Sequence, residues 1–87
     1  MAKHKRLLLT KHAQDAITER KLDLEWIERT VNSPSWRHPD PHRLGVERRF
    51  RAIPEFGGRI LRVACLETAD EVRIITIFFD RDAREPK

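Results

Sequence analysis

The sequence has 87 residues, a single cysteine and a formal net charge of +4 from 18 basic and 14 acidic side chains. A chain this short forms one domain with a small core, and a lone cysteine excludes a disulfide scaffold. Its longest apolar run falls far below the about 20 residues of a membrane span, so we expect a cytoplasmic protein without a membrane partner. We expect a single domain over residues 1–87, with an ordered core over 7–84 and charged termini.

The first predicted elements are a short strand and a short helix. Residues 7–9, three leucines, form a strand or an extended lead-in. Thr10 then caps a helix over residues 11–21, because its hydroxyl can accept an otherwise unpaired backbone N–H. The apolar stripe of this helix consists of Ala13, Ala16 and Ile17. This narrow stripe indicates a helix that packs closely on its neighbour.

The second helix has clearer boundaries. Asp23 is a good N-cap, and the apolar spacing that follows is helical. Asn32 can take the left-handed conformation that ends a helix, and Pro34 prevents its continuation. Residues 33–43 then contain three prolines. Proline forbids helix and disfavours a central strand, so we expect a rigid loop there.

The second half of the chain has the period of β-strands. Three strands are predicted, over residues 43–53, 59–67 and 71–80. Their short connections, "PEFGG" and "TAD", favour an antiparallel meander. The expected fold is therefore α+β with the order (β)ααβββ, in which two helices pack on one face of a small antiparallel sheet.

Alternation along the first of these strands separates an apolar face from a charged one. Val46 and Phe50 point one way, whereas Glu47, Arg49 and Arg51 point the other way. We expect the helices to cover the apolar face. The charged face, extended by arginines from the next strand, is then expected to face solvent.

Basic residues concentrate in the middle of the chain. Thirteen of the 18 basic residues are arginine, and residues 37–62 hold seven arginines against three acids. The planar guanidinium fits phosphate oxygens in pairs. The composition suits a polyanion such as RNA, or an acidic protein partner. An ordinary solvated surface explains the charge equally well.

Four local features together carry a resemblance to a known family. They are "KHAQDAITER" on the first helix, "LDLEWI" at the start of the second, the proline-rich joint, and the closing "VRIITIFFDRDAR". From Leu9 to Arg84, the chain resembles a family of small bacterial proteins carried as a domain of unknown function. That family is similar in layout to the RelE/ParE-like and BrnT-like toxins of toxin–antitoxin pairs.

The resemblance implies a toxin-like function. Many RelE-like toxins are metal-independent endoribonucleases that need no cofactor, whereas ParE-like toxins act otherwise. Expected partners are RNA, free or in the ribosome, and an antitoxin-like protein. The motif positions in this chain are His12, Ala13, Arg20 and Thr76. The chain has no tyrosine, although a tyrosine often assists in RelE-like sites.

Metal-free RNA cleavage needs a base for the 2′-hydroxyl, cations for the charge that develops on the phosphate, and an acid for the leaving oxygen. Histidine titrates near neutral pH, and arginine binds phosphate. The predicted catalytic residues are His12, Arg20 and Arg51. The predicted nucleic-acid-binding residues are Lys11, Arg49, Arg62, Arg81 and Arg84.

Structural alternatives remain for these residues. His12 can instead pin its helix to the sheet through a backbone hydrogen bond. Arg48, which falls on the apolar face, can extend its charged end to solvent or pair with a helix acid such as Glu28. Trp36 is either a stacking platform for a base or a lid over the sheet edge. A third hypothesis is a partial metal site formed by His38, Asp40 and His42. A non-catalytic module that binds an acidic partner such as an antitoxin is the alternative function.

Overall fold

In the computed structural model, which describes residues 5–86, α1 (Lys11–Arg20) begins at its predicted cap. The Thr10 hydroxyl accepts the Ala13 backbone N–H at 3.2 Å. The same residue ties the helix to the sheet, because its backbone N–H donates to the carbonyl of Ile74 at 3.2 Å and its hydroxyl donates to that of Ile75 at 3.3 Å. No loop therefore separates the first strand from α1.

The second helix, α2 (Leu24–Asn32), also begins at its predicted cap. The Asp23 carboxylate accepts the Glu25 backbone N–H at 2.9 Å. The predicted left-handed cap at Asn32 is wrong: Asn32 is the last helical residue, and the cap is Ser33, whose φ is −141°. Since Pro34 follows directly, the helix needs no left-handed residue to stop it.

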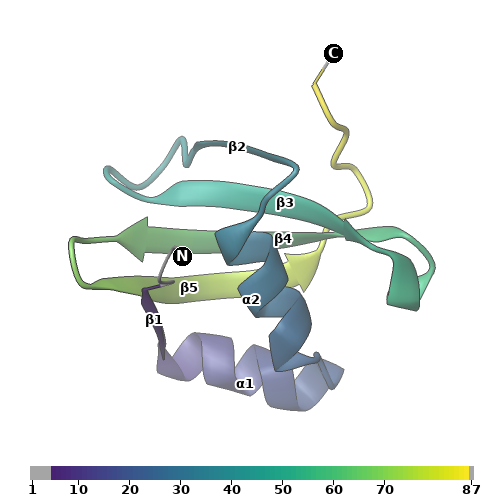
Figure 1. Ribbon diagram of the computed structural model, residues 1–87, viewed down its shortest axis with the longest axis horizontal. Coiled ribbons are helices and arrows are strands. Elements are labelled where there is room, and N and C mark those ends of the chain that lie inside the picture. Colours follow the sequence, from purple (N-terminus) through teal and green to yellow (C-terminus); the bar gives the residue numbers. More distant parts are fainter. Residues whose placement is uncertain (1–4, 87) are drawn as a thin grey trace.

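The sheet has five strands: β1 (Arg6–Leu9), β2 (Trp36–Pro39), β3 (Glu47–Ile53), β4 (Arg59–Glu67) and β5 (Glu71–Phe79). Their spatial order is β1-β5-β4-β3-β2 (Figure 1). The meander of β3, β4 and β5 is antiparallel as predicted, but β1 pairs with β5 in parallel. The sheet is therefore mixed, which corrects the antiparallel prediction within an α+β fold.

The strand β2 lies inside the segment that was predicted to be a rigid loop. It pairs antiparallel with β3, from Trp36 opposite Phe50 to Pro39 opposite Glu47. Because β2 is the outermost strand, Pro39 can lack a backbone donor without breaking a ladder between two neighbours. Proline thus restricts this strand to the edge of the sheet.

The core lies between the sheet and α2. This helix crosses the sheet, whereas α1 runs along the β5 side, below the sheet in Figure 1. Ile27 of α2 and the strand residues Ile53, Leu61 and Val63 are completely buried. Ala13 joins α1 to the same core. The narrow alanine stripe thus lets α1 approach the sheet closely, as the sequence predicts.

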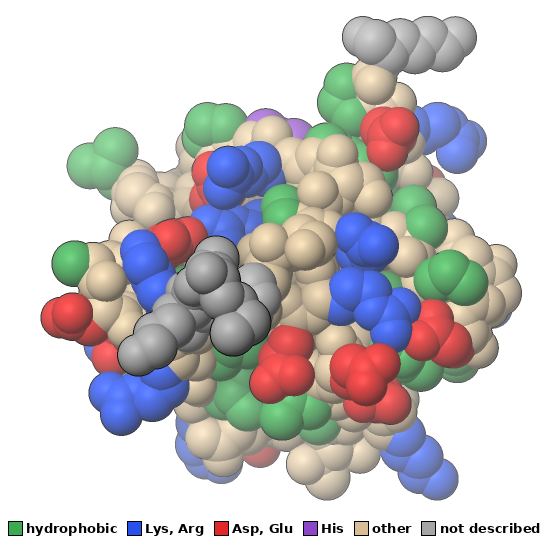
Figure 2. Space-filling model, viewed as in Figure 1, with side chains coloured by type: hydrophobic (Ala, Val, Ile, Leu, Met, Phe, Trp, Pro, Cys, Tyr) green, Lys and Arg blue, Asp and Glu red, His purple; other side chains and the backbone are tan. Residues whose placement is uncertain are grey.

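The surface seen from the α2 side carries charges of both signs. Figure 2 shows Lys and Arg side chains interspersed with Asp and Glu side chains on this face. Arg29 of α2, for example, binds Glu25 at 2.9 Å and Glu55 at 2.7 Å. Neighbouring charges on this side thus neutralise one another, so a polyanion finds no uniform positive surface there.

Candidate functional site

Alternation along β3 is correctly predicted, but the covered face is not. The Arg49 guanidinium donates to the carbonyl of Val31 in α2 at 2.8 Å, so Arg49 points toward the helix. Its neighbours Arg48 and Phe50 therefore point away from α2. The charged face of β3, which was expected to face solvent, therefore lies under α2. The apolar face, which was expected to be covered by the helices, lies on the side away from α2.

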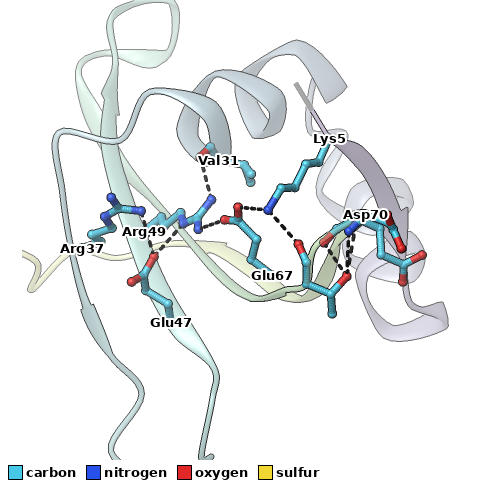
Figure 3. Close-up of polar contacts among 9 residues, drawn as sticks. Lys5, Val31, Arg37, Glu47, Arg49, Glu67 and Asp70 are labelled. Carbon is cyan, nitrogen blue, oxygen red and sulfur yellow. Dashed lines mark hydrogen bonds and ion pairs between the residues drawn. The ribbon is translucent and has the colours of Figure 1, made fainter. Parts of the chain in front are cut away.

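Arg49 is sealed inside a network of ion pairs, which Figure 3 shows between β3, β4 and the N-terminal segment. It is only 5% exposed, and it donates to Glu47 at 2.8 Å and to Glu67. Glu67 in turn binds Lys5 at 2.6 Å. Burial lowers the pKa of Arg49, but the hydrogen bonds to Glu67 and Glu47 outweigh it, so the guanidinium stays charged.

Arg51 lies on the same side as Arg49 and donates to the carbonyl of Ser33, just after α2. The predicted charged face of Arg49 and Arg51, extended by arginines of the next strand, is therefore wrong, because Arg62 of that strand pairs with Phe50 and lies on the opposite face. Lys11 is an exposed helix residue that pairs with Asp15 at 3.7 Å. Arg49, Arg51 and Lys11 thus lie apart from the site described next.

The face away from α2 carries two cross-strand rows. One row contains Trp36, Phe50, Arg62 and Phe78, which are direct partners across β2, β3, β4 and β5. The next row contains His38, Arg48, Ala64 and Thr76. Since paired residues share a face, this side of the sheet displays aromatic rings and two guanidinium groups beside each other.

A cavity of about 390 Å³ lies between this sheet face and α1. The residues 40–43, which follow β2, close its third side. Its lining includes two histidines, four arginines and a threonine: His12, Arg20, His42, Arg43, Arg48, Arg62 and Thr76. Carboxylates of Asp15, Glu19 and Asp40 also line it. The cavity therefore combines phosphate-binding cations with groups that can transfer protons.

The cavity brings together three of the predicted site residues, His12, Arg20 and Arg62. His12 lies in the first turn of α1 and Arg20 in its last, so the cavity extends along most of the helix. Thr76, a motif position of the resemblance, lies on the opposite wall. The sheet thus supplies the groups between two helix residues that are about 12 Å apart along the axis.

Arg62 is the most constrained cation of the cavity. Its guanidinium lies 4.2 Å from the centre of the Phe78 ring and donates to Asp80 at 3.2 Å. Its Nε is buried and has no hydrogen-bond partner among the described residues. Burial lowers the pKa of Arg62, and the positive charge of Arg48 lowers it further. An anion between these two guanidinium groups would relieve their repulsion.

Asp40 fixes the segment that carries His42. One carboxylate oxygen accepts the His42 backbone N–H at 2.8 Å, and the other accepts from Arg48 Nε at 3.3 Å. These two bonds hold the pKa of Asp40 below its ordinary value, the His42 bond most strongly. The predicted pair of Arg48 with Glu28 is therefore wrong, and Arg48 instead anchors the wall of the cavity.

Sequence reasoning assigned no role in a shared site to Arg43 or Arg48. A signal for Arg48 exists, since it is the single charge on the apolar side of its strand. Trp36 stacks on Phe50 with ring centres 4.7 Å apart and an angle of 5°. Trp36 thus covers Phe50 at the edge of the sheet, which corresponds to the lid alternative. Part of the Trp36 surface stays exposed.

The metal-site hypothesis fails on the arrangement of its side chains. Within residues 5–86, no three His, Cys, Asp or Glu side chains are grouped so that they could hold a metal ion. The His38 ring packs 5.1 Å from that of Phe50, and Asp40 binds Arg48.

Within residues 5–86, neither helix has the length and apolarity that crossing a membrane requires.

Comparison with known families identifies a match to most of the chain. A family model with the description "Domain of unknown function (DUF4258)" matches residues 9–79. This range includes both helices, all of β2 to β5, and every residue named above as lining the cavity. No curated protein and no solved structure matches the chain.

Proposed function

The chain belongs to the family of DUF4258 domains, and we propose that it is a toxin-like protein that binds RNA in the cavity beside α1 and cleaves it without a metal ion. The RelE-like layout expected from the sequence is part of this proposal. The observation that carries it is that His12 and His42 line the same cavity as Arg48 and Arg62.

The arginines provide the phosphate site. Arg48 and Arg62 lie on adjacent strands and share one face, and each already binds a single carboxylate. Their remaining N–H groups can donate to the two non-bridging oxygens of a phosphodiester. These donors are held by Asp40, Asp80 and the Phe78 ring, so little reorganisation is needed as negative charge develops.

The histidines provide the proton transfers. One imidazole removes the proton from the 2′-hydroxyl, and that oxygen then attacks the phosphorus. The bond from phosphorus to the 5′-oxygen breaks, and the second imidazole gives its proton to the departing oxygen. The products are a 2′,3′-cyclic phosphate and a free 5′-hydroxyl. His12 and His42 occupy different walls of the cavity, as a base and an acid on opposite sides of the phosphate require.

The test is cleavage of a labelled RNA oligonucleotide in the presence of a chelator. The wild type should yield 2′,3′-cyclic phosphate ends, and the His12→Ala and His42→Ala variants should each be slower by about 10²-fold or more. His38→Ala is the matched control, because His38 lies outside the cavity lining and should leave cleavage unchanged. Intact RNA with the wild type, or equal rates in all four proteins, would refute the cleavage proposal.

A further inference from the structure

A second hollow lies next to the cavity, at the far end of α1. It has a volume of about 700 Å³ and runs between the α1–α2 joint, the turn after β3 and the segment after β5. Five cations line it: Arg20, Lys21, Arg59, Arg81 and Arg84. We call this hollow the basic groove. It contains Arg81 and Arg84, two of the predicted nucleic-acid-binding residues, which the cavity does not include.

The basic groove gathers most of the free positive charge of the described chain. Among residues 5–86, seven lysines and arginines have no carboxylate within 4.0 Å, and five of these seven line the groove. The acid in its lining, Asp80, is already paired with Arg62. Uncompensated like charges on a concave surface attract an anionic ligand. Outside the groove, by contrast, nine of the eleven lysines and arginines within residues 5–86 have a carboxylate within 4.0 Å.

The floor of the basic groove is aromatic. Trp26, Phe56 and Phe79 form a cluster whose ring centres lie 4.7–6.1 Å apart. The Arg59 guanidinium lies 5.1 Å from the centre of the Phe56 ring, which is 41% exposed. Rings and stacked guanidinium planes are the surfaces on which nucleobases stack in proteins that bind single strands.

The cavity and the basic groove meet at Arg20, which lines both. Phe78 lines the cavity and Phe79 lines the groove, so the two hollows lie on either side of the end of β5. A strand with one phosphodiester beside Arg48 and Arg62 must leave the cavity. The groove is the neighbouring surface whose charge and rings suit its next nucleotides.

We propose that the basic groove is a binding site for the nucleotides that flank the phosphodiester held in the cavity. The ligand is single-stranded RNA, bound through its phosphates by arginine and through its bases by the aromatic floor. This inference rests on the proposed function, since it assigns the path of the same strand. Because stacking accepts every base, the groove gives affinity with little sequence preference.

The test compares short and long ligands. A dinucleotide fills the cavity alone, whereas an oligonucleotide of about ten nucleotides also reaches the groove. Both are made as 2′-fluoro RNA, which lacks the attacking hydroxyl and stays intact. The groove variant is Arg59→Gln/Arg81→Gln, and the cavity variant is Arg62→Met. Arg6→Gln is the matched control, because its side chain is 79% exposed and it lines neither hollow.

The groove variant should bind the long ligand at least tenfold more weakly and the dinucleotide as the wild type does. Its slope of log K against log salt should fall by about 1.4, since each cation that contacts single strands contributes about 0.7. The cavity variant should lose affinity for both ligands. Trp26 fluorescence, measured in a Trp36→Phe background, should be quenched only by the long ligand.

The outcomes separate the two proposals. Unchanged binding of the long ligand by the groove variant would overturn the RNA path, while weaker binding by the cavity variant would leave the proposed function standing. If the wild type binds neither ligand, both proposals fail. If the groove variant loses affinity for poly-glutamate but not for RNA, the groove is instead a site for an acidic protein partner, and the RNA path is refuted.

Discussion

Arg48 and Arg49 are adjacent in the chain, yet the sheet gives them opposite surroundings. Arg49 points under α2, where one carbonyl and two carboxylates use its donors. Arg48 points away from α2 and uses one bond to Asp40 on the wall of a cavity. The difference teaches that an arginine-rich strand is not a ligand-binding surface in itself. The neighbouring carboxylates decide which guanidinium groups keep donors for a ligand.

The same comparison predicts which arginines matter for stability and which for binding. On the covered face, removal of an arginine leaves acids and a carbonyl without their partner. On the cavity face, removal of Arg62 leaves one carboxylate, Asp80, without this partner, but it also takes away a cation that repels Arg48. Three substitutions test this contrast.

The largest effect on stability is expected for Arg49→Met. The substitution keeps approximately the volume of the side chain but removes the buried hydrogen bonds that Arg49 gives to Glu67, Glu47 and the Val31 carbonyl. We expect the free energy of unfolding to fall by about 3 kcal/mol. The midpoint of urea denaturation measures it, and Arg73→Met, an exposed arginine on β5, is the control. A loss under about 0.5 kcal/mol, the range of ordinary surface substitutions, would contradict the structural role of Arg49.

A smaller effect is expected for Arg62→Met on the other face. The methionine can still pack on Phe78, and repulsion with Arg48 disappears, so stability should change by less than about 1 kcal/mol. Phosphate binding should nevertheless weaken about tenfold, as loss of a charged hydrogen bond predicts. Titration with single-stranded RNA measures the binding. If Arg62→Met lowers the free energy of unfolding as much as Arg49→Met does, the arginines of the two faces do not differ in their contribution to stability.

The smallest effect is expected for Glu67→Gln, and it depends on pH. Hydrogen bonds from Arg49 and then Lys5 lower the pKa of Glu67 from 4.5 to about 2 in the folded protein. A lowered pKa adds stability above pH 4.5, and that stability is lost as the pH falls through about 2. Because Glu67 is partly exposed, we expect the substitution to cost about 0.5 kcal/mol at neutral pH.

Denaturation curves at several pH values measure this contribution. The difference between wild type and Glu67→Gln should shrink on acidification and approach zero near pH 2. Glu85→Gln, on an exposed residue after β5, should leave the pH dependence unchanged. A difference that stays constant at all pH values would show that Glu67 acts through its shape and not its charge.

The local structure could be predicted from the sequence because it depends on neighbouring residues. Thr10 and Asp23 start their helices through hydrogen bonds within three residues. Gly57 and Gly58 have the positive φ angles, 67° and 72°, that their turn requires. In each case the residue meets a requirement of its own segment, a helix cap or a turn. These residues can therefore be identified without knowledge of any distant contact.

The covered face could not be predicted, because alternation shows that two faces differ but not which one meets a helix. Arg49 looks like a surface residue, and its burial depends on Glu67, which is 18 positions away. The edge strand β2 was missed for a related reason, since Pro39 is compatible with a strand only at the border of a sheet. The cavity combines α1, β3, β4 and β5, so it exists only in the assembled fold.

The direct passage from β1 through Thr10 into α1 has a consequence for motion. A four-residue outer strand is the part of a sheet that opens most easily. When β1 leaves β5, the hydrogen bonds from Thr10 to Ile74 and Ile75 must break as well, and α1 moves with the strand. Amide hydrogens of these two elements should therefore exchange with solvent together, and sooner than those of β4. The wall of the cavity that carries His12 should therefore open more readily than the wall formed by β4.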